Sequence, residues 1–459
     1  MQPEFAPRDA PFVKLTVLSK SELAEWCGNA TETGRRWVEA NGFGAEPTEV
    51  LSVPDGSGGI AEVLAGGVSQ DPGHDTRFHL ASVLRRLPAG NYRLANKLSQ
   101  QDRDEAALAS LFAQYWPSTR RNGRSHSALL VAPEGTDCEK LLAIAEGEFL
   151  VRDMVNAPAS EMTPGCLEKV FRRIAEANSA DLRVVKGKEL AVECPMTHAV
   201  GRSSEHEPRL LELNWGTSGP LVSLAGKGVC FDTGGLNMKS GRAMALMKKD
   251  MAGAAVVASL CSVIMKLKLP VRFRALIPVA ENSVSERSVR PGDVLVSKSG
   301  VRVEITNTDA EGRLLLADTL TLAEERESDL LVSFGTLTGA ARTALGPEIV
   351  PFYAVNNRLA GLLEEAGGRV RDPLWRMPLW QPYRGMLESD VADIKNSSST
   401  AFAGSITAAL FLNHFVRRRE SFAHFDIYGW QASAAPGRPK GGCGQAGRAV
   451  LEAITEFLL

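Results

Sequence analysis

Short runs of aliphatic and β-branched residues alternate along this chain with longer stretches that have helical periodicity. Residues 128–132 and 221–225 are largely apolar, as in buried strands, whereas residues 106–116, 140–154 and 250–266 predict helices. Such an alternation is typical of an α/β fold, in which helices cover the faces of a sheet. We therefore expect an α/β protein whose larger part has a mixed, mostly parallel sheet flanked by helices.

Turn residues interrupt the pattern after about one third of the chain. Asn156-Ala157-Pro158 and Thr163-Pro164 follow one of the helical stretches. The chain has 459 residues, 44% of them hydrophobic, which is enough for two domains with separate cores. We expect a smaller N-terminal α/β domain at residues 1–138, a linking helix at 139–157 and a larger C-terminal catalytic α/β domain at 158–459.

Charge and cysteine content narrow the class of protein. The formal net charge is -2, so the overall balance indicates neither a nucleic-acid partner nor an anionic membrane surface. Seven cysteines are scattered without C-x-x-C spacing, which argues against a disulfide framework or a zinc ribbon. The first residues lack a basic region followed by an apolar core, and the longest apolar stretch, residues 252–265, is too short to span a bilayer. We expect a cytoplasmic protein.

The run Asn307-Thr308-Asp309-Ala310-Glu311-Gly312-Arg313 sets two carboxylates and a guanidinium at alternate positions. In an extended segment alternate side chains share one face, so Asp309, Glu311 and Arg313 are expected to point into the same space. Adjacent carboxylates repel each other unless cations lie between them, which favours a metal site. The alternatives are a solvated strand face, or a capping sequence before the helical stretch that begins at Leu314.

A second polar block follows the predicted strand at 221–225. It holds Lys227 and Asp232 in a glycine-rich loop, and Asp250 at the start of a predicted helix. Ligands at the carboxyl ends of strands are the usual arrangement in open α/β sheets. The alternative for Asp250 is a helix cap. Two strands predicted within residues 293–306 would bring the first block to the same edge.

Together the blocks offer five candidate metal ligands: Lys227, Asp232, Asp250, Asp309 and Glu311. Their four carboxylates would be neutralised by two divalent cations but not by one. A lysine can ligate only as the neutral amine, so a nearby dication must displace its proton. A P-loop is excluded, because no glycine lies five positions before Gly226 and Gly228 replaces the required Ser or Thr. None of the seven histidines lies in either block.

Both blocks, with the separation between them, resemble the leucine aminopeptidase family (cytosol aminopeptidases, peptidase family M17). The resemblance covers about residues 150 to 459. It includes Val155-Asn156-Ala157-Pro158, Thr163-Pro164, Glu281-Asn282, Arg290-Pro291-Gly292-Asp293, Thr336-Leu337-Thr338-Gly339-Ala340, Ser389-Asp390-Val391-Ala392-Asp393 and Ala403-Gly404-Ser405-Ile406-Thr407-Ala408-Ala409. Before residue 150 only length and position indicate an equivalent domain.

The resemblance implies a leucyl aminopeptidase-type hydrolase that removes the N-terminal residue from peptides. One divalent ion, zinc or manganese, would be held by Asp232, Asp309 and Glu311, and a second by Lys227, Asp232, Asp250 and Glu311. A water between two such metals is acidified toward neutrality and supplies the hydroxide nucleophile. The free N-terminal amine would ligate one metal, so an acylated amine should not bind productively.

The same resemblance gives roles to two further cations. Lys239 would stabilise the oxyanion of the tetrahedral intermediate, and Arg313 would hold a bicarbonate ion as general base in a bidentate pair. The family also prefers leucine-like and other neutral N-terminal residues and assembles as homo-hexamers. Its substrate-contact positions match Met247, Thr336, Leu337 and Gly339.

Three segments depart from the family pattern: Ser283, Ser333-Phe334-Gly335 and Gly442-Cys443-Gly444-Gln445. They flank the site, so they bear on pocket shape and specificity. Other functions remain open at this stage: a two-metal phosphoester hydrolase, a DNA-binding role with steep salt dependence, and a catalytically silent scaffold. Lys227 as a ligand argues against the first, the near-neutral charge against the second, and the full set of polar site residues against the third.

Overall fold

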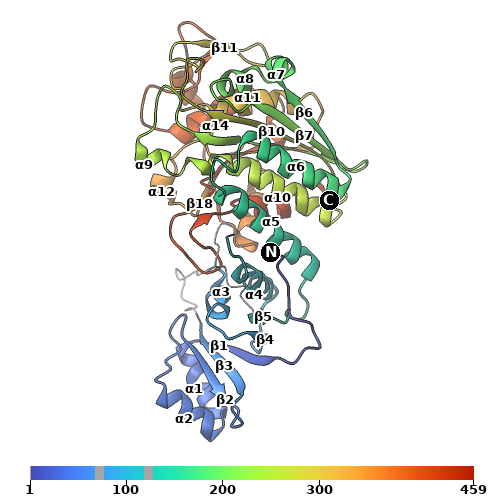
Figure 1. Cartoon of the computed structure of the whole chain (residues 1–459), viewed down its shortest axis with the longest axis vertical. Helices are drawn as coiled ribbons and strands as arrows, with labels where there is room; N and C mark the ends of the chain where they lie inside the picture. Colours follow the sequence, from blue (N-terminus) through green and yellow to red (C-terminus); the bar gives the residue numbers. More distant parts are fainter. Residues whose placement is uncertain (1, 68–76, 118–127) are drawn as a thin grey trace. The chain divides into compact units, whose positions relative to one another are not determined.

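Figure 1 shows the computed structural model of the chain, which describes residues 2–67, 77–117 and 128–459. Backbone contacts divide the chain into two compact units. The first contains Met1–Glu146 and Ala432–Lys440, and the second contains Gly147–Gln431 and Gly441–Leu459. Within the described residues no helix is long and apolar enough to cross a membrane. None of the seven cysteines, all of which are described, forms a disulfide.

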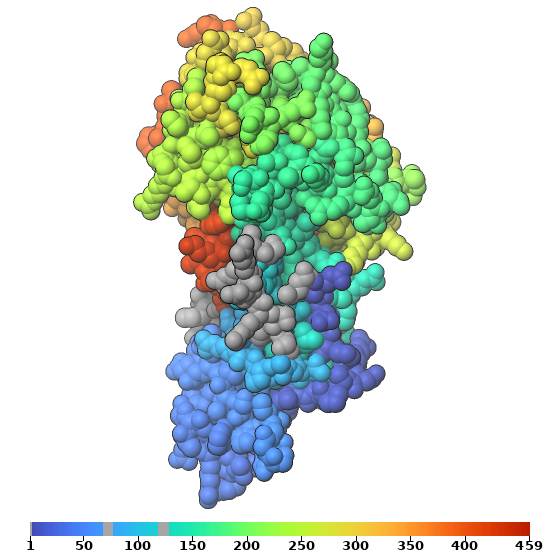
Figure 2. Space-filling view, viewed as in Figure 1, coloured from blue at the N-terminus to red at the C-terminus, as the bar shows by residue number. Residues whose placement is uncertain are grey.

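The first unit is built on a five-stranded sheet in the order β2-β3-β1-β4-β5. All neighbouring strands are parallel except β2 and β3. Leu15 on β1 and Val63 on β3 are completely buried, so the middle of the sheet forms a core. Blue residues from the start of the chain form much of the surface of this unit in Figure 2. The elements are β1 (Val13–Leu18), α1 (Lys20–Asn29), α2 (Glu32–Ala40), β2 (Val50–Pro54), β3 (Ile60–Gly66), α3 (His79–Leu84), β4 (Gly90–Leu94), α4 (Gln100–Ala113) and β5 (Ala128–Leu130).

The second unit contains a nine-stranded mixed sheet in the order β15-β14-β17-β13-β8-β10-β7-β6, with β9 also paired to β10. The central strands β8, β9, β10, β13 and β17 make four pairings with one another, all of them parallel. Antiparallel pairings lie toward both ends of the sheet. The strands are β6 (Asp181–Lys186), β7 (Arg209–Trp215), β8 (Leu221–Gly226), β9 (Gly228–Asp232), β10 (Arg272–Asn282), β13 (Leu330–Gly335), β14 (Val350–Ala354), β15 (Leu374–Arg376) and β17 (Phe422–Asp426). The predicted α/β fold with a mixed, mostly parallel sheet is confirmed.

Helices cover this sheet on both faces, with α8 and α11 on one side and α6 and α10 on the other (Figure 1). The remaining short strands are β11 (Val294–Val296), β12 (Arg302–Glu304), β16 (Ile394–Lys395), β18 (Trp430–Gln431) and β19 (Gly441–Gly442). The helices are α5 (Cys138–Asn156), α6 (Pro164–Asn178), α7 (Gly187–Glu193), α8 (Pro195–Gly201), α9 (Gly241–Met244), α10 (Ala252–Lys266), α11 (Gly312–Ala323), α12 (Arg342–Leu345), α13 (Asn357–Arg369), α14 (Gly404–His414) and α15 (Gly447–Leu458). Three 3-10 segments complete the chain: η1 (Met247–Met251), η2 (Gln381–Leu387) and η3 (Arg419–Ser421).

Most predicted elements of the second unit are confirmed. The strand expected at 221–225 is β8, and the two strands expected within 293–306 are β11 and β12, which pair in antiparallel fashion. The helix expected from residue 250 begins instead at Ala252, because Asp250 lies in the 3-10 segment η1. In the first unit the helix expected at 106–116 is α4, which begins earlier, at Gln100.

The helix predicted between the domains is α5. The division between the two compact units falls inside this helix, between Glu146 and Gly147. One segment late in the chain, Ala432–Lys440, belongs to the first unit, which no feature of the sequence indicated. The domain limits at residues 138 and 158 stay predictions.

Candidate metal centre

Lys227 follows the last residue of the central strand β8. A side chain does not fit at Gly226, because a Cβ there would lie 2.7 Å from the Gly253 carbonyl oxygen. The backbone of Lys227 is fixed on both sides, since its N–H donates to Phe334 O and its carbonyl accepts from Ala254 N, each at 2.9 Å. The lysine is only 2% exposed. A charged group is thus held at the carboxyl edge of the sheet, where it is costly unless it has partners.

Three carboxylates converge at this edge. Asp232 is the last residue of β9, Asp309 lies in the turn after β12, and Glu311 directly precedes α11. One oxygen from each lies within 4.8 Å of the others, an arrangement able to hold a metal ion. Asp232 and Glu311 are almost completely buried.

The predicted reason for this convergence is wrong. The segment after β12 is not extended, because Thr308 and Asp309 form a turn and Glu311 already has helical angles, φ -72° and ψ -37°. Arg313 is therefore the second residue of α11 and not the third member of a strand face. Glu311 occupies the cap position of that helix without a side-chain capping bond, which leaves its carboxylate available to the cluster.

The Lys227 ammonium lies between two carboxylates. Its Nζ is 2.7 Å from Asp250 Oδ2 and 2.9 Å from Glu311 Oε1. Asp250 does not cap α10; its Oδ1 accepts a hydrogen bond of 2.6 Å from Thr336 Oγ1. Burial acts to lower the pKa of Lys227, but the neighbouring carboxylates outweigh it and raise the pKa above its usual value. A bound dication would have to displace this proton before the amine could act as a ligand.

Gly312 makes room for this lysine. A Cβ at Gly312 would lie 2.5 Å from Lys227 Cε and 2.6 Å from Nζ. The first turn of α11 therefore packs directly against the ammonium group.

Lys239 pairs with the other two carboxylates. Its Nζ lies 2.8 Å from Asp232 Oδ2 and also contacts Asp309 Oδ1. Burial opposes its charge, yet the pKa of Lys239 is raised because Asp232 and Glu311 are close. Two ammonium groups thus face four carboxylates, which leaves the cluster with excess negative charge.

The donor atoms suit divalent cations. Asp250 Oδ2, Asp309 Oδ1 and Glu311 Oε1 are buried and accept no aligned hydrogen bond from the described residues, although each lies at ion-pair distance from a lysine. Burial, followed by the charge of Asp232, raises the pKa of Glu311 to about 8. Carboxylate oxygens with a single amine match the preferences of zinc and manganese, so the residues fit the predicted metals.

Arg313 is buried at the same end of the sheet. Its Nη1 donates to Asn396 O at 2.7 Å, while its Nε has no acceptor among the described residues. Burial lowers the pKa of Arg313 to about 10. The guanidinium remains charged at neutral pH and has donor capacity left for an anion.

Several residues of the centre had no predicted role. Asn282 Nδ2 donates to Asp232 Oδ1 at 2.8 Å and to Thr308 O at 3.1 Å, so it fixes one ligand and the turn that carries another. Thr308 Oγ1 in turn donates to Gly234 O at 2.7 Å. Asn282 belongs to the Glu281-Asn282 motif of the sequence, which was the available signal.

The predicted substrate segment, Thr336 to Gly339, follows β13 and is held by Asp426. Asp426 Oδ1 accepts from Leu337 N at 2.9 Å and Thr338 N at 3.0 Å. Asp426 Oδ2 accepts from Thr338 Oγ1 at 2.6 Å and Ser405 Oγ at 2.8 Å. The segment is therefore tied to the end of β17. Met247, the fourth predicted contact, begins η1 and is half-buried.

Lys249 and Arg342 lie near this segment. Lys249 Nζ is 5.0 Å from the centre of the Tyr428 ring, and the Arg342 guanidinium carbon is 4.1 Å from it. Burial lowers the pKa of Lys249 to about 8. Neither residue was singled out from the sequence, because both contacts join positions far apart in the chain.

Two of the segments that depart from the family pattern make buried polar contacts. Ser333 Oγ lies 2.8 Å from His424 Nδ1, between neighbouring strands. Gln445 Oε1 accepts from the backbone N–H groups of Tyr428 and Gly429, each at 2.9 Å. These residues therefore shape the backbone on which Tyr428 lies.

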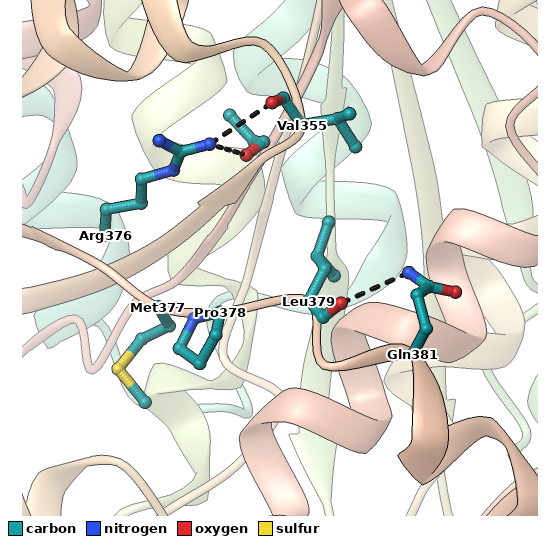
Figure 3. Close-up of a pocket in the computed structure, with 7 residues that line it drawn as sticks. Val355, Arg376, Met377, Pro378, Leu379 and Gln381 are labelled. Carbon is teal, nitrogen blue, oxygen red and sulfur yellow. Dashed lines mark hydrogen bonds between the residues drawn. The ribbon is translucent and has the colours of Figure 1, made fainter.

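The pockets of the second unit include one near the metal centre and a larger one on another strand. One, with a volume of about 300 Å³, adjoins the turn of the first polar block and is lined by Asn237, Thr306, Asn307, Lys395, Ser397, Ser398 and Ser399. The other, of about 500 Å³, is lined by residues of β14, β15 and the segment that follows. Figure 3 shows Arg376 fixed there by the Val355 carbonyl, and Gln381 donating to Leu379 O. No predicted ligand lines this larger pocket.

Comparison with curated proteins gives relatives of one kind. The probable cytosol aminopeptidase of Roseiflexus castenholzii is 40% identical over 322 residues, which cover 69% of this chain and 66% of that protein. The probable cytosol aminopeptidase of Chlamydia muridarum is 43% identical over 294 residues, which cover 62% and 59%. The matched region thus spans slightly less than two thirds of the length of these relatives.

Solved structures match over nearly the whole chain. The cytosol aminopeptidase from Coxiella burnetii has a TM-score of 0.93 and 39% identity, with 98% of both chains covered. The bottromycin maturation enzyme BotP, in complex with Mn, has a TM-score of 0.87 and 31% identity, with 97% of this chain and 99% of that chain covered.

Family models match both the N-terminal and the C-terminal part of the sequence. A model described as the M17 aminopeptidase N-terminal domain matches residues 13–133. A second, described as the catalytic domain of the cytosol aminopeptidase family, matches residues 149–451, which is more than half of the chain. This chain therefore belongs to the cytosol aminopeptidase family, peptidase family M17.

Proposed function

We propose that this protein is a metal-dependent aminopeptidase that hydrolyses the N-terminal residue from peptides. The observation that carries the proposal is the buried cluster of Asp232, Asp309 and Glu311, whose oxygens lie within 4.8 Å of one another beside Lys227. The cluster lies within residues 149–451, the part of the chain that matches the family's catalytic domain.

Two divalent ions, zinc or manganese, would bind here. Asp232, Asp309 and Glu311 would hold one, and Lys227, Asp232, Asp250 and Glu311 the other. When bound, the ions activate water as the nucleophile and polarise the scissile carbonyl. A solved structural relative of this chain was determined in complex with Mn, which supports manganese as one candidate.

Lys239 would stabilise the oxyanion that develops on the carbonyl. Its side chain is 14% exposed and reaches the cluster through Asp232 and Asp309, so substrate can approach it. A preorganised cation at such a position stabilises the transition state by a few kcal/mol, which raises the rate by about a hundredfold or more.

Arg313 would hold bicarbonate as the general base. The unsatisfied Nε beside a bound Nη1 supports this role, because a planar oxyanion can accept two parallel bonds from a guanidinium. Held there by Arg313, the ion would supply general-base chemistry.

The substrate is a peptide with a free N-terminus. Met247, Thr336, Leu337 and Gly339 would contact it, and a flexible methionine tolerates several apolar side chains, consistent with leucine-like N-terminal residues. We also propose a cytosolic location and a homo-hexamer, and the description of the relatives as cytosol aminopeptidases supports the location.

The test is release of p-nitroaniline from leucine p-nitroanilide by protein loaded with manganese or zinc. The N-acetylated substrate and a chelated sample serve as controls. We expect turnover of the free-amine substrate alone, abolished by chelation. Equal turnover of the acetylated substrate, or activity that survives chelation, would contradict the proposal.

A further inference from the structure

Lys249 is a buried lysine that forms no ion pair with a described residue. It is 4% exposed and lies directly before the proposed ligand Asp250. Within residues 2–67, 77–117 and 128–459, its ammonium group forms no hydrogen bond and no ion pair, and it lies 5.0 Å from the centre of the Tyr428 ring. A buried cation without an acceptor is costly to the fold, which suggests that something outside the chain supplies one.

Arg342 places a second cation on the same ring. Its guanidinium carbon lies 4.1 Å from the centre of Tyr428, and its Nη1 donates to Thr338 O at 3.2 Å. Among the described side chains no carboxylate lies at ion-pair distance from it. A Cβ on Gly339 would come within 2.9 Å of Arg342 Nη2, so this guanidinium borders the proposed substrate segment.

The nearby carboxylates are already engaged. Both oxygens of Asp426 accept hydrogen bonds, from Leu337, Thr338 and Ser405. Asp250 is engaged by Lys227 and Thr336. Two cations beside the substrate segment therefore have no anionic partner of their own.

We propose that Lys249 and Arg342, which both lie against the Tyr428 ring, form a subsite for a carboxylate of the peptide substrate. This deepens the proposed function, on which it rests, by naming a substrate class: peptides with an acidic N-terminal side chain, or short peptides whose C-terminal carboxylate reaches the same place. A guanidinium and an ammonium recognise a carboxylate through charge-assisted hydrogen bonds.

The experiment compares isosteric substrates that differ only in charge. In one arm, kcat/KM is measured for glutamyl and glutaminyl p-nitroanilide. In the other, it is measured for leucyl-glycine and leucyl-glycinamide. In one of the two pairs we expect the substrate with the carboxylate to have a kcat/KM about tenfold higher than its amide, the effect of one charge-assisted hydrogen bond. The pair that shows this preference identifies which carboxylate of the substrate binds, the N-terminal side chain or the C-terminus.

The variants Lys249→Met and Arg342→Met test the residues. In each variant the ratio of kcat/KM for the acid to kcat/KM for the amide should fall toward one. Because both values come from the same variant, a general loss of activity cancels in this ratio. Arg342 is half-exposed, so its variant tests the subsite even if substitution of the buried lysine disturbs folding. The control is Arg358→Met, because Arg358 lies over the Phe457 ring, 5.2 Å from its centre, away from the site; it should keep the wild-type ratio.

The two proposals fail in different ways. Turnover of leucine p-nitroanilide with no charge preference in either arm, or a preference that survives both substitutions, overturns the subsite and leaves the aminopeptidase. If no substrate is turned over, the aminopeptidase proposal fails, and calorimetric titration with glutamate and glutamine decides the subsite. Tighter binding of glutamate, lost in Arg342→Met, would support it; equal binding would overturn it.

Discussion

Two charged clusters in the second unit differ in their ratio of cationic to anionic side chains. At the metal centre two lysines face four carboxylates, and the pKa of Glu311 is raised to about 8 by burial and by Asp232. Around Glu168 on α6 the ratio is reversed: Arg172, Lys186 and Arg209 all contact one carboxylate, at 2.6 to 2.7 Å. Burial acts to raise the pKa of Glu168, but these three partners lower it to about 2.

The difference separates a structural cluster from a functional one. The Glu168 cluster is satisfied by the chain itself, so it stabilises the fold and needs nothing from solution. The metal centre is left with excess negative charge and with carboxylate oxygens that no aligned donor reaches. Such an arrangement is stable only with added cations, which is why perturbed carboxylates indicate a site.

Removing a shared ligand should have the largest effect. Asp232→Ala takes away an oxygen proposed to contact both ions, so we expect loss of both metals and a fall in kcat/KM of about a thousandfold or more. Asp250→Ala should lose one ion. Metal content by mass spectrometry, with the exposed Asp390→Ala as control, checks the difference. Full occupancy in Asp232→Ala would mean that the carboxylate excess does not recruit the ions.

Lys239 should separate catalysis from metal binding. It contacts two proposed ligands but is not itself a ligand, so Lys239→Met should keep both ions and lower kcat by about a hundredfold. Metal content by mass spectrometry and an assay of turnover check this expectation. Normal turnover would remove the oxyanion role and leave Lys239 as a charge-balancing residue only.

Asp426 should affect binding more than chemistry. Asp426→Ala removes the acceptor for the N–H groups of Leu337 and Thr338, so the substrate segment loses its anchor and KM should rise about tenfold, the cost of one or two such bonds. Asp426→Asn retains an acceptor oxygen and should recover part of the loss. A change in kcat with KM unaltered would contradict a positioning role.

Glu168→Gln should change stability and leave metal content as it is. Its lowered pKa means that the carboxylate stabilises the fold above its ordinary pKa of 4.5, and that this stabilisation disappears as the pH falls toward 2. Loss of the charge-assisted bonds should lower the free energy of unfolding by about 2 kcal/mol at pH 7.

Thermal unfolding of both proteins between pH 7 and pH 3 checks this. The gap between the melting temperatures should stay constant down to about pH 5 and narrow only below the ordinary pKa of 4.5. A gap independent of pH would show that the Glu168 charge contributes nothing to the fold.

The fold class and the family followed from the sequence, and both are confirmed. Apolar runs such as β8 could be predicted because a strand buried on both faces must be apolar throughout. The glycine-rich segment after it located Lys227 and Asp232 at strand ends, although residues 228–232 form the strand β9 and not the predicted loop. The ligand assignments themselves, and the roles of Lys239 and Arg313, stay predictions.

What the sequence did not reveal depends on contacts between distant segments. Asp309 and Glu311 do lie close together, but not for the predicted reason, because a turn and not an extended strand brings them together. Asp426 lies 89 positions from Leu337, and local patterns carry no record of such a pairing. The Tyr428 contacts of Lys249 and Arg342 were missed for the same reason.

The close approach of Gly312 to Lys227 also restricts how this protein can vary. Even the methyl group of alanine at position 312 would occupy the volume of the lysine's terminal atoms. A larger residue there would be tolerated only with a shorter one at 227, so the two positions must change together in evolution. Any line of descent that lost the lysine would be free to lose the glycine, and sequences that keep the lysine should keep the glycine.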